Sequence, residues 1–195
     1  MPEQLASDVE LLRRMGAGDE AAFTELYRRR QGGVYRFAFQ MCGSAAVADD
    51  VVQETFLTVI GGHARYQESR GSVAAFLYGI ARNHVLRAAQ RDRKHAGEPD
   101  AEHVAAQGDL AREVVRSRML ESVRAAVLML PVHYREAVVL CDLHEMEYAE
   151  AAEALGCAIG TVRSRLHRGR QMLAERLGGN REPAPDGIKP VRCET

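Results

Sequence analysis

The chain has 195 residues, of which 46% are hydrophobic, and its formal net charge is −1 at pH 7. This length leaves room for one large or two small globular domains, and the near-neutral charge excludes a protein that is basic throughout, so any nucleic-acid binding must come from locally gathered charge. The four cysteines lie far apart with no Cys-x-x-Cys pair, which argues against a disulfide framework and a zinc knuckle, so we expect neither a metal nor a cofactor.

Helical patterns fill the first half of the chain. Apolar residues recur every three and four positions and strand-like alternation is absent, which predicts an all-α fold. The expected helices span residues 9–15, 20–41, 45–60 and 72–91, with Asp19 capping the second and Ser72 the fourth. Gly61 and Gly62 are expected to break the third helix. Together these helices make a first domain, residues 1–91.

A polar segment separates this domain from a second one. Residues 92–109 include Gly97, Pro99 and Gly108 and few large apolar groups, which is typical of a flexible linker. Residues 110–177 form the second domain, with helices expected over 110–130, 132–143, 148–155 and 160–177. The tail, residues 178–195, holds three of the six prolines and is expected to be disordered.

The last two expected helices form the most informative pattern. Gly156 can adopt the left-handed conformation that ends a helix, and the next helix starts about three residues later, as in a helix-turn-helix motif. One face of that next helix is expected to enter the core and carries Ile159, Val162, Leu166, Gly169 and Leu173. The opposite face carries Thr161, Arg163, Ser164, His167, Arg168 and Gln171.

The charge on this outer face suits nucleic acid. Residues 161–176 contain five arginines and one glutamate, and arginine, serine and threonine donate hydrogen bonds to bases and phosphates. The alternative is an ordinary solvated face. Elsewhere, residues 82–94 hold five basic residues against one aspartate, whereas residues 49–54 hold three carboxylates and no base. Clusters of opposite charge predict two different partners.

Two motifs carry a family resemblance. The first is Ala48-Asp49-Asp50-Val51-Val52-Gln53-Glu54-Thr55-Phe56, and the second comprises Leu130-Pro131, Arg135, Tyr148 and the run from Leu155 to Leu166. In this order they resemble regions 2.2 and 4 of bacterial sigma factors of the small extracytoplasmic-function group, within the sigma-70 family. The resemblance implies two small helical domains that bind core RNA polymerase and recognise promoter DNA.

The resemblance also implies roles for individual residues. Recognition of the −35 element as duplex would involve Tyr148, Thr161, Arg163, Ser164, Arg165, His167 and Arg168. Capture of an unstacked base of the −10 element would involve Tyr66, Arg70, Ser72, Asn83, Arg87 and Arg91. Docking on the coiled coil of the polymerase β′ subunit would involve Asp49, Asp50, Gln53, Glu54 and Phe56. Glu147 would be an acidic cap for the first helix of the helix-turn-helix motif.

Further partners and competing interpretations follow from the same features. The family implies contacts with the β subunit as well and an anti-sigma factor, which could hold the chain at the inner face of the membrane. No apolar run approaches the ~20 residues of a membrane-spanning helix and the amino terminus resembles no export signal, so we expect a cytoplasmic protein. A dimeric helix-turn-helix regulator is the alternative. No catalytic motif is present, so we do not expect an enzyme.

Overall fold

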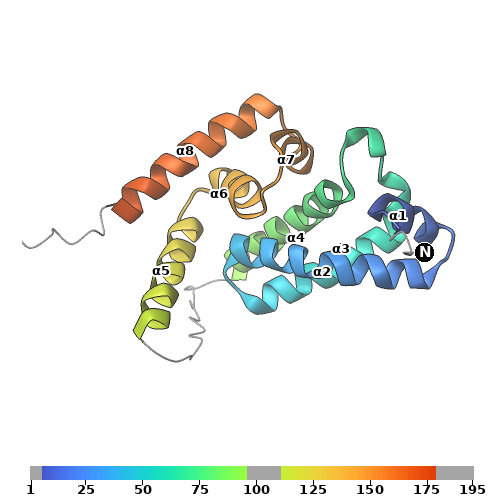
Figure 1. The fold of residues 1–195 in the computed structure, drawn as a ribbon, viewed down its shortest axis with the longest axis horizontal. Coiled ribbons are helices and arrows are strands. Elements are labelled where there is room, and N and C mark those ends of the chain that lie inside the picture. Colours follow the sequence, from blue (N-terminus) through green and yellow to red (C-terminus); the bar gives the residue numbers. More distant parts are fainter. Residues whose placement is uncertain (1–5, 96–110, 179–195) are drawn as a thin grey trace, which may run out of the picture.

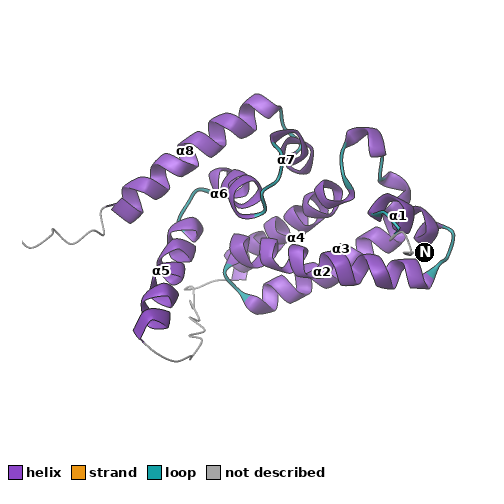
Figure 2. Cartoon of the chain, viewed as in Figure 1, coloured by secondary structure: helices purple, strands orange, loops and turns teal. Residues whose placement is uncertain are grey.

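The computed structural model describes residues 6–95 and 111–178, and within these ranges every regular element is helical (Figure 2). The first half contains α1 (Asp8–Gly16), α2 (Glu20–Cys42), α3 (Ala45–Gly62), the short 3₁₀ turns η1 (His63–Arg65) and η2 (Glu68–Arg70), and α4 (Val73–His95). The second half contains α5 (Ala111–Leu128), α6 (Val132–Val138), the π-helical turn η3 (Val139–Leu143), α7 (Tyr148–Leu155) and α8 (Ile159–Gly178).

Local sequence signals place most helix ends where the sequence predicts them. The carboxylate of Asp19 accepts a hydrogen bond from the backbone N–H of Ala22 at 3.0 Å, and the hydroxyl of Ser72 accepts one from Ala75 at 3.2 Å. Both side chains therefore satisfy backbone donors that a helix start leaves unpaired. These two predicted caps are confirmed.

Two predicted boundaries are wrong. The third helix runs through Gly61 to Gly62 and passes directly into η1, because a helical glycine costs only ~1 kcal/mol relative to alanine and does not itself end a helix. The expected helix 132–143 instead changes at Val139 into the wider turn η3, in which the N–H of His144 bonds to the carbonyl of Val139. Hydrophobic periodicity does not distinguish such a turn from a continuing α-helix.

Residues 96–110 and 179–195 lie outside the described residues. They include most of the expected linker and the expected tail with Cys193. The first residues of that linker are helical, because α4 continues to His95.

The first half is a small helical bundle. Helices α2, α3 and α4 lie beside one another, and α1 packs against α2 at one end (Figure 1). The largest side chains in its interior are almost completely inaccessible to solvent and are contributed by every helix: Leu11, Leu26, Phe37, Val59 and Leu77. Burying such side chains supplies ~1.5–3 kcal/mol each, which is the main driving force for this bundle.

The second half packs onto the first instead of standing apart from it. The main cluster of buried residues includes Val127, Leu140, Ala151 and Leu155 together with the interior of the first bundle, and α7 contacts α4 while α5 contacts α2. A smaller cluster joins α6 to α8 through Leu130, Ala137, Val138 and Leu166. The two predicted domains thus share one continuous interior.

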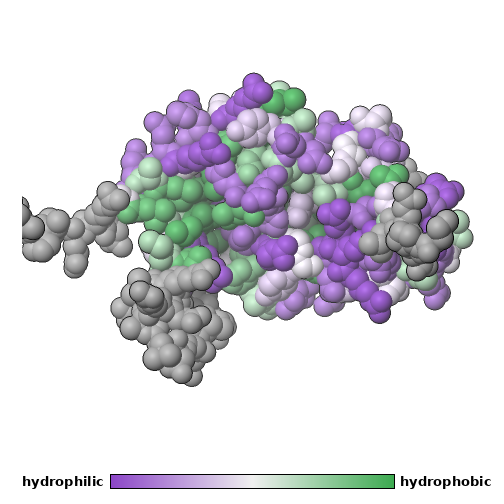
Figure 3. Space-filling view, in the orientation of Figure 1, coloured by the Kyte–Doolittle hydropathy of each residue, from purple (hydrophilic) through white to green (hydrophobic). Residues whose placement is uncertain are grey.

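An apolar surface remains exposed on the second half. Met119 and Leu120 of α5 are 69% and 49% exposed, and Met129 is 68% exposed. Figure 3 shows hydrophobic surface gathered where α5 and α8 face each other. None of the described helices is both long and apolar enough to cross a membrane.

Candidate nucleic-acid interfaces

The turn between α7 and α8 has the predicted geometry. Gly156 adopts the left-handed conformation, with φ 62° and ψ 40°. Its N–H bonds to the carbonyl of Glu153 at 3.2 Å, and that of Cys157 bonds to Ala152 at 3.0 Å. This pair of bonds ends α7 and lets α8 start at Ile159 in a new direction, as a helix-turn-helix motif requires.

The inner face of α8 matches the prediction except at its first residue. Val162, Leu166 and Gly169 are buried, and a Cβ at Gly169 would lie 2.7 Å from a methyl carbon of Val138, so α8 approaches α6 closely there. Ile159, predicted to face the core, is instead 43% exposed. It is the first residue of α8 and lies at the edge of the core.

The outer face of α8 presents hydrogen-bond donors to solvent. Arg163, Ser164, His167 and Arg168 are exposed, whereas Thr161 and Arg165 are half-buried. The hydroxyl of Ser164 donates to the carbonyl of Thr161 at 3.0 Å, so its oxygen can still accept a hydrogen bond. This is a convex surface rich in positive charge and of the width of one helix, which the major groove of duplex DNA accommodates.

Two aromatic side chains hold arginines on this face. The guanidinium of Arg163 lies 5.7 Å from the ring centre of Tyr148, within the range of a cation–π contact. Arg168 donates to the hydroxyl of Tyr134 at 3.4 Å, and this bond raises the pKa of the Arg168 guanidinium.

Glu147 was predicted to cap α7 through its carboxylate. It occupies the cap position but its side chain makes no capping hydrogen bond, so the predicted capping bond is wrong.

The residues predicted to capture an unpaired base are only partly brought together. Four of them line one cleft of about 400 Å³: Tyr66, Arg70, Ser72 and Asn83. Arg87 is exposed on α4 outside it, and Arg91 lines a second cleft beside Asp50, Glu54 and His84. Residues spaced four apart on a helix are slightly rotated relative to one another around its axis. Asn83, Arg87 and Arg91 therefore face progressively different directions along α4.

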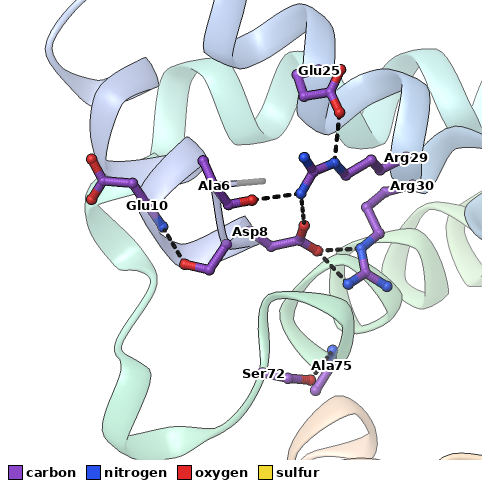
Figure 4. Close-up of polar contacts among 9 residues, drawn as sticks. Ala6, Asp8, Glu10, Glu25, Arg29, Arg30, Ser72 and Ala75 are labelled. Atoms are coloured by element: carbon purple, nitrogen blue, oxygen red, sulfur yellow. Dashed lines mark hydrogen bonds and ion pairs between the residues drawn. The ribbon is translucent and has the colours of Figure 1, made fainter. Parts of the chain in front are cut away.

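The cleft combines an aromatic wall with polar groups. Tyr66 and Phe76 place their ring centres 5.6 Å apart, and the hydroxyl of Tyr66 donates to the carbonyl of Gly71 at 3.0 Å. Burial raises the pKa of the Tyr66 hydroxyl, so the side chain stays neutral. The cap formed by Ser72 orients the start of α4 (Figure 4). An aromatic wall with arginine and asparagine nearby suits an unstacked base and its phosphate.

Sequence reasoning missed one side of this cleft. Its far wall is the end of α7, residues 153–156, and Arg82 of α4 also lines it. Arg70 and Glu153 approach within 3.6 Å across the opening. No pattern along the chain signals this contact, because it joins segments from the two halves.

The predicted polymerase-docking residues divide into a surface and its support. Asp49, Asp50, Gln53 and Glu54 are exposed on one side of α3. Phe56 is only 2% exposed and packs against the rings of Phe23 and Tyr27. Phe56 therefore packs α3 against α2 and offers no surface to a partner. Leu57 and Ile60, which the sequence prediction did not include, are 62% and 48% exposed on α3.

A network of ion pairs anchors α1 to the bundle. Asp8 pairs with Arg29 at 3.5 Å and also with Arg30, while Arg29 donates to the carbonyl of Ala6 at 2.6 Å and to Glu25 at 2.7 Å (Figure 4). Because α1 also contacts η1, this network supports the segment that leads into the cleft.

Each half of the chain matches a family model. Residues 26–95 match the model "Sigma-70 region 2" and residues 120–173 match "Sigma-70, region 4". The ECF RNA polymerase sigma factor SigM of Mycobacterium tuberculosis is 34% identical over 172 residues, which cover 88% of this chain and 85% of SigM. This chain belongs to the extracytoplasmic-function sigma factors. A second relative, the ECF RNA polymerase sigma factor SigE of Mycolicibacterium smegmatis, is 37% identical over 167 residues, which cover 82% of this chain and 64% of SigE.

Two solved structures share this fold over both halves. RpoE of Bartonella quintana, in complex with the anti-sigma factor NepR, superimposes with a TM-score of 0.64 at 28% identity and covers 82% of this chain and 98% of RpoE. CnrH in complex with the cytosolic domain of CnrY gives a TM-score of 0.68 at 24% identity over 90% of this chain and 99% of CnrH. A sigma factor therefore accounts for both halves, which a dimeric helix-turn-helix regulator does not.

Proposed function

We propose that this sigma factor is a dissociable specificity subunit of bacterial RNA polymerase, in which each described surface has one role. The exposed side of α3 docks on the β′ coiled coil, the cleft between η2 and α4 takes an unpaired base of the −10 element, and the outer face of α8 reads the −35 element as duplex. Phosphodiester chemistry then belongs to the polymerase, and this chain is not an enzyme.

The observation that carries the proposal is the separation of opposite charges onto different helices. The acidic and polar residues of α3 are exposed together, while the donors of α8 are exposed at the other end of the chain. A basic partner and a polyanion could therefore be bound simultaneously. We assign polymerase and −10 binding to residues 1–91 and −35 binding to residues 110–177, with 92–109 as linker and 178–195 as tail.

An anti-sigma factor is a further proposed partner. The apolar surface around Met119, Leu120 and Met129 is exposed, and amphipathic segments bind such surfaces. RpoE and CnrH were both solved with a bound partner. Such an inhibitor would hold this chain in the cytoplasm or at the inner face of the membrane.

Charge reversal on α3 tests the docking assignment. Asp50→Lys combined with Glu54→Lys should weaken binding to purified core polymerase at least about tenfold, because like charges would meet across the interface. The matched control is Glu121→Lys with Glu175→Lys, which makes the same charge change on exposed residues of α5 and α8. Binding is measured by fluorescence anisotropy, and transcription from genomic fragments reports the start sites. Undiminished binding by the α3 variant would show that the docking surface lies elsewhere.

A further inference from the structure

An acidic side chain from outside the helix-turn-helix motif pairs with an arginine of α8. Helices α6 and α7, which the π-helical turn η3 connects, both pack against α8 (Figure 1). The carboxylate of Asp142 in η3 accepts two hydrogen bonds from the guanidinium of Arg170, from Nε at 3.1 Å and from Nη2 at 2.5 Å. Two parallel bonds of this kind fix the direction of an arginine more strictly than a single contact does.

Arg170 lies on the same side of α8 as Arg163. The two residues are seven positions apart, which is close to two turns of an α-helix. Tyr148, the first residue of α7, has its ring centre 5.7 Å from the guanidinium of Arg163. The carboxylate of Asp142 raises the pKa of the Arg170 guanidinium most, and the phenol of Tyr148 adds to this rise. Tyr148 therefore lies beside both arginines.

These contacts form a network of four side chains that begins in η3 and ends on the outer face of α8. Asp142 holds Arg170, Arg170 limits the positions open to the phenol of Tyr148, and the ring of Tyr148 holds Arg163. The side chains of Asp142 and Arg170 are 27% and 55% exposed, so the pair lies at the surface and outside the buried core. A surface pair adds little to stability, and its main consequence is the direction of the side chains it joins.

The partner of Arg170 differs in charge from the partners of Arg163 and Arg168. Those two arginines contact the neutral phenols of Tyr148 and Tyr134, so they keep their full positive charge. Arg170 is instead paired with a carboxylate. Each phosphate that an arginine neutralises releases counterions and strengthens binding to any DNA sequence. An arginine that a carboxylate already neutralises adds little to such sequence-independent binding.

We propose that Asp142 is a positioning residue that sets specificity: through Arg170 and Tyr148 it orients Arg163, and it keeps the charge of Arg170 away from DNA phosphates. This role rests on the proposed reading of the −35 element by α8. Asp142 itself touches no DNA. Loss of its carboxylate therefore strengthens binding to any duplex and weakens the preference for the promoter. A loss of folding would not produce these two opposite changes together.

The principal test is Asp142→Asn, which keeps the size of the side chain and removes its charge. The full-length protein is titrated with fluorescein-labelled duplexes that contain the −35 segment of a mapped promoter or a scrambled version of it, and anisotropy is measured over a range of salt concentrations. On the scrambled duplex, the plot of log affinity against log salt should become steeper by about 0.9, the contribution of one added phosphate contact. The preference for the promoter should fall about two- to fivefold, which corresponds to the loss of one exposed cation–π contact.

The matched control removes the same charge elsewhere on α8. Glu175→Gln changes an exposed carboxylate of that helix and should keep the salt dependence and the preference of the wild type. Circular dichroism verifies the helix content of each variant. If a folded Asp142→Asn protein behaved like the wild type, or if Glu175→Gln changed binding as much, the positioning role would be overturned.

A second variant removes the arginine through which Asp142 acts. Arg170→Gln should lose the same promoter preference but keep the wild-type salt dependence, because Arg170 contacts no phosphate while Asp142 holds it. Adding Asp142→Asn to Arg170→Gln should change neither quantity further. A weaker salt dependence in Arg170→Gln would show that Arg170 binds phosphate in the wild type, which contradicts the role of Asp142.

The proposed function is scored separately with the wild type. Equal affinity of the wild type for the promoter and scrambled duplexes would count against −35 reading by α8. The salt dependence on the scrambled duplex would still decide whether Asp142 keeps Arg170 away from phosphates.

Discussion

A single contact restricts the side chain of Arg163 on the outer face of α8. Its guanidinium lies over the ring of Tyr148 at 5.7 Å, and both side chains are exposed. A cation–π contact at such a site contributes ~0.5–1 kcal/mol, which restricts the arginine without immobilising it. In the proposed function, Arg163 would thus be partly oriented before it meets DNA and could still adjust to a base edge or a phosphate.

Replacing this arginine separates the two possibilities. Arg163→Ala should cost ~1–3 kcal/mol of discrimination between promoter and scrambled duplex if it reads a base. Arg176→Ala, at an exposed position in the last turn of α8, serves as the control and should alter discrimination little. Competition binding with the mapped promoter measures both. An equal loss on every duplex would instead identify Arg163 as a phosphate contact.

The helix-turn-helix element depends on one glycine far more than on the next. Gly156 has a φ of 62°, which disfavours a residue with a Cβ, whereas Gly160 lies in the first turn of α8 and has open space around it. The same substitution should therefore have opposite effects at the two positions.

Alanine substitutions measure this difference directly. Gly156→Ala should lower the free energy of unfolding by about 1 kcal/mol, because alanine is strained in the left-handed region. Gly160→Ala should raise it by about 0.5–1 kcal/mol, because alanine is the better helix former. Urea unfolding followed by circular dichroism gives both values. A stabilising effect at Gly156 would mean that the turn does not need its left-handed residue.

Within the whole molecule, His144 couples the packing of the two halves to pH. It contacts Tyr78 of α4 and Gln40 of α2, and burial, followed by the positive charge of Arg36, lowers its pKa from 6.5 to about 4. The neutral form of His144 is therefore the one that the packed halves accommodate. As pH falls below 6.5, His144 binds a proton when the halves are apart but not when they are packed together, so the packing weakens by up to about 1.4 kcal/mol per pH unit until pH 4.

Acidification should consequently expand the free protein. The radius of gyration is expected to rise between pH 6.5 and pH 4 in the wild type, and this dependence should be reduced in His144→Gln, which cannot be protonated. Small-angle X-ray scattering across this pH range measures the radius of gyration. A radius that stays constant in the wild type, or changes equally in the variant, would exclude His144 as the titrating group.

The sequence by itself determined the elements and the outward residues of single helices. Asp19, Ser72 and Gly156 act locally through their own backbone neighbours, so their effects can be predicted without knowing the rest of the fold. Periodicity likewise placed Arg163 and Ser164 outside α8. It also identified the exposed acidic side of α3, because a helical pattern separates the two faces of its own helix.

Only the tertiary structure decided which faces of distant helices meet. Periodicity predicted burial for Ile159, which is 43% exposed, and the family resemblance assigned Arg91 to the same site as Asn83 although they line different clefts. The approach of Glu153 to Arg70 and the burial of Glu136 against Arg82 depend on the packing of one half on the other. The sequence pattern of a single helix does not predict such contacts, because they depend on complementary shape and charge between segments that are far apart in the sequence.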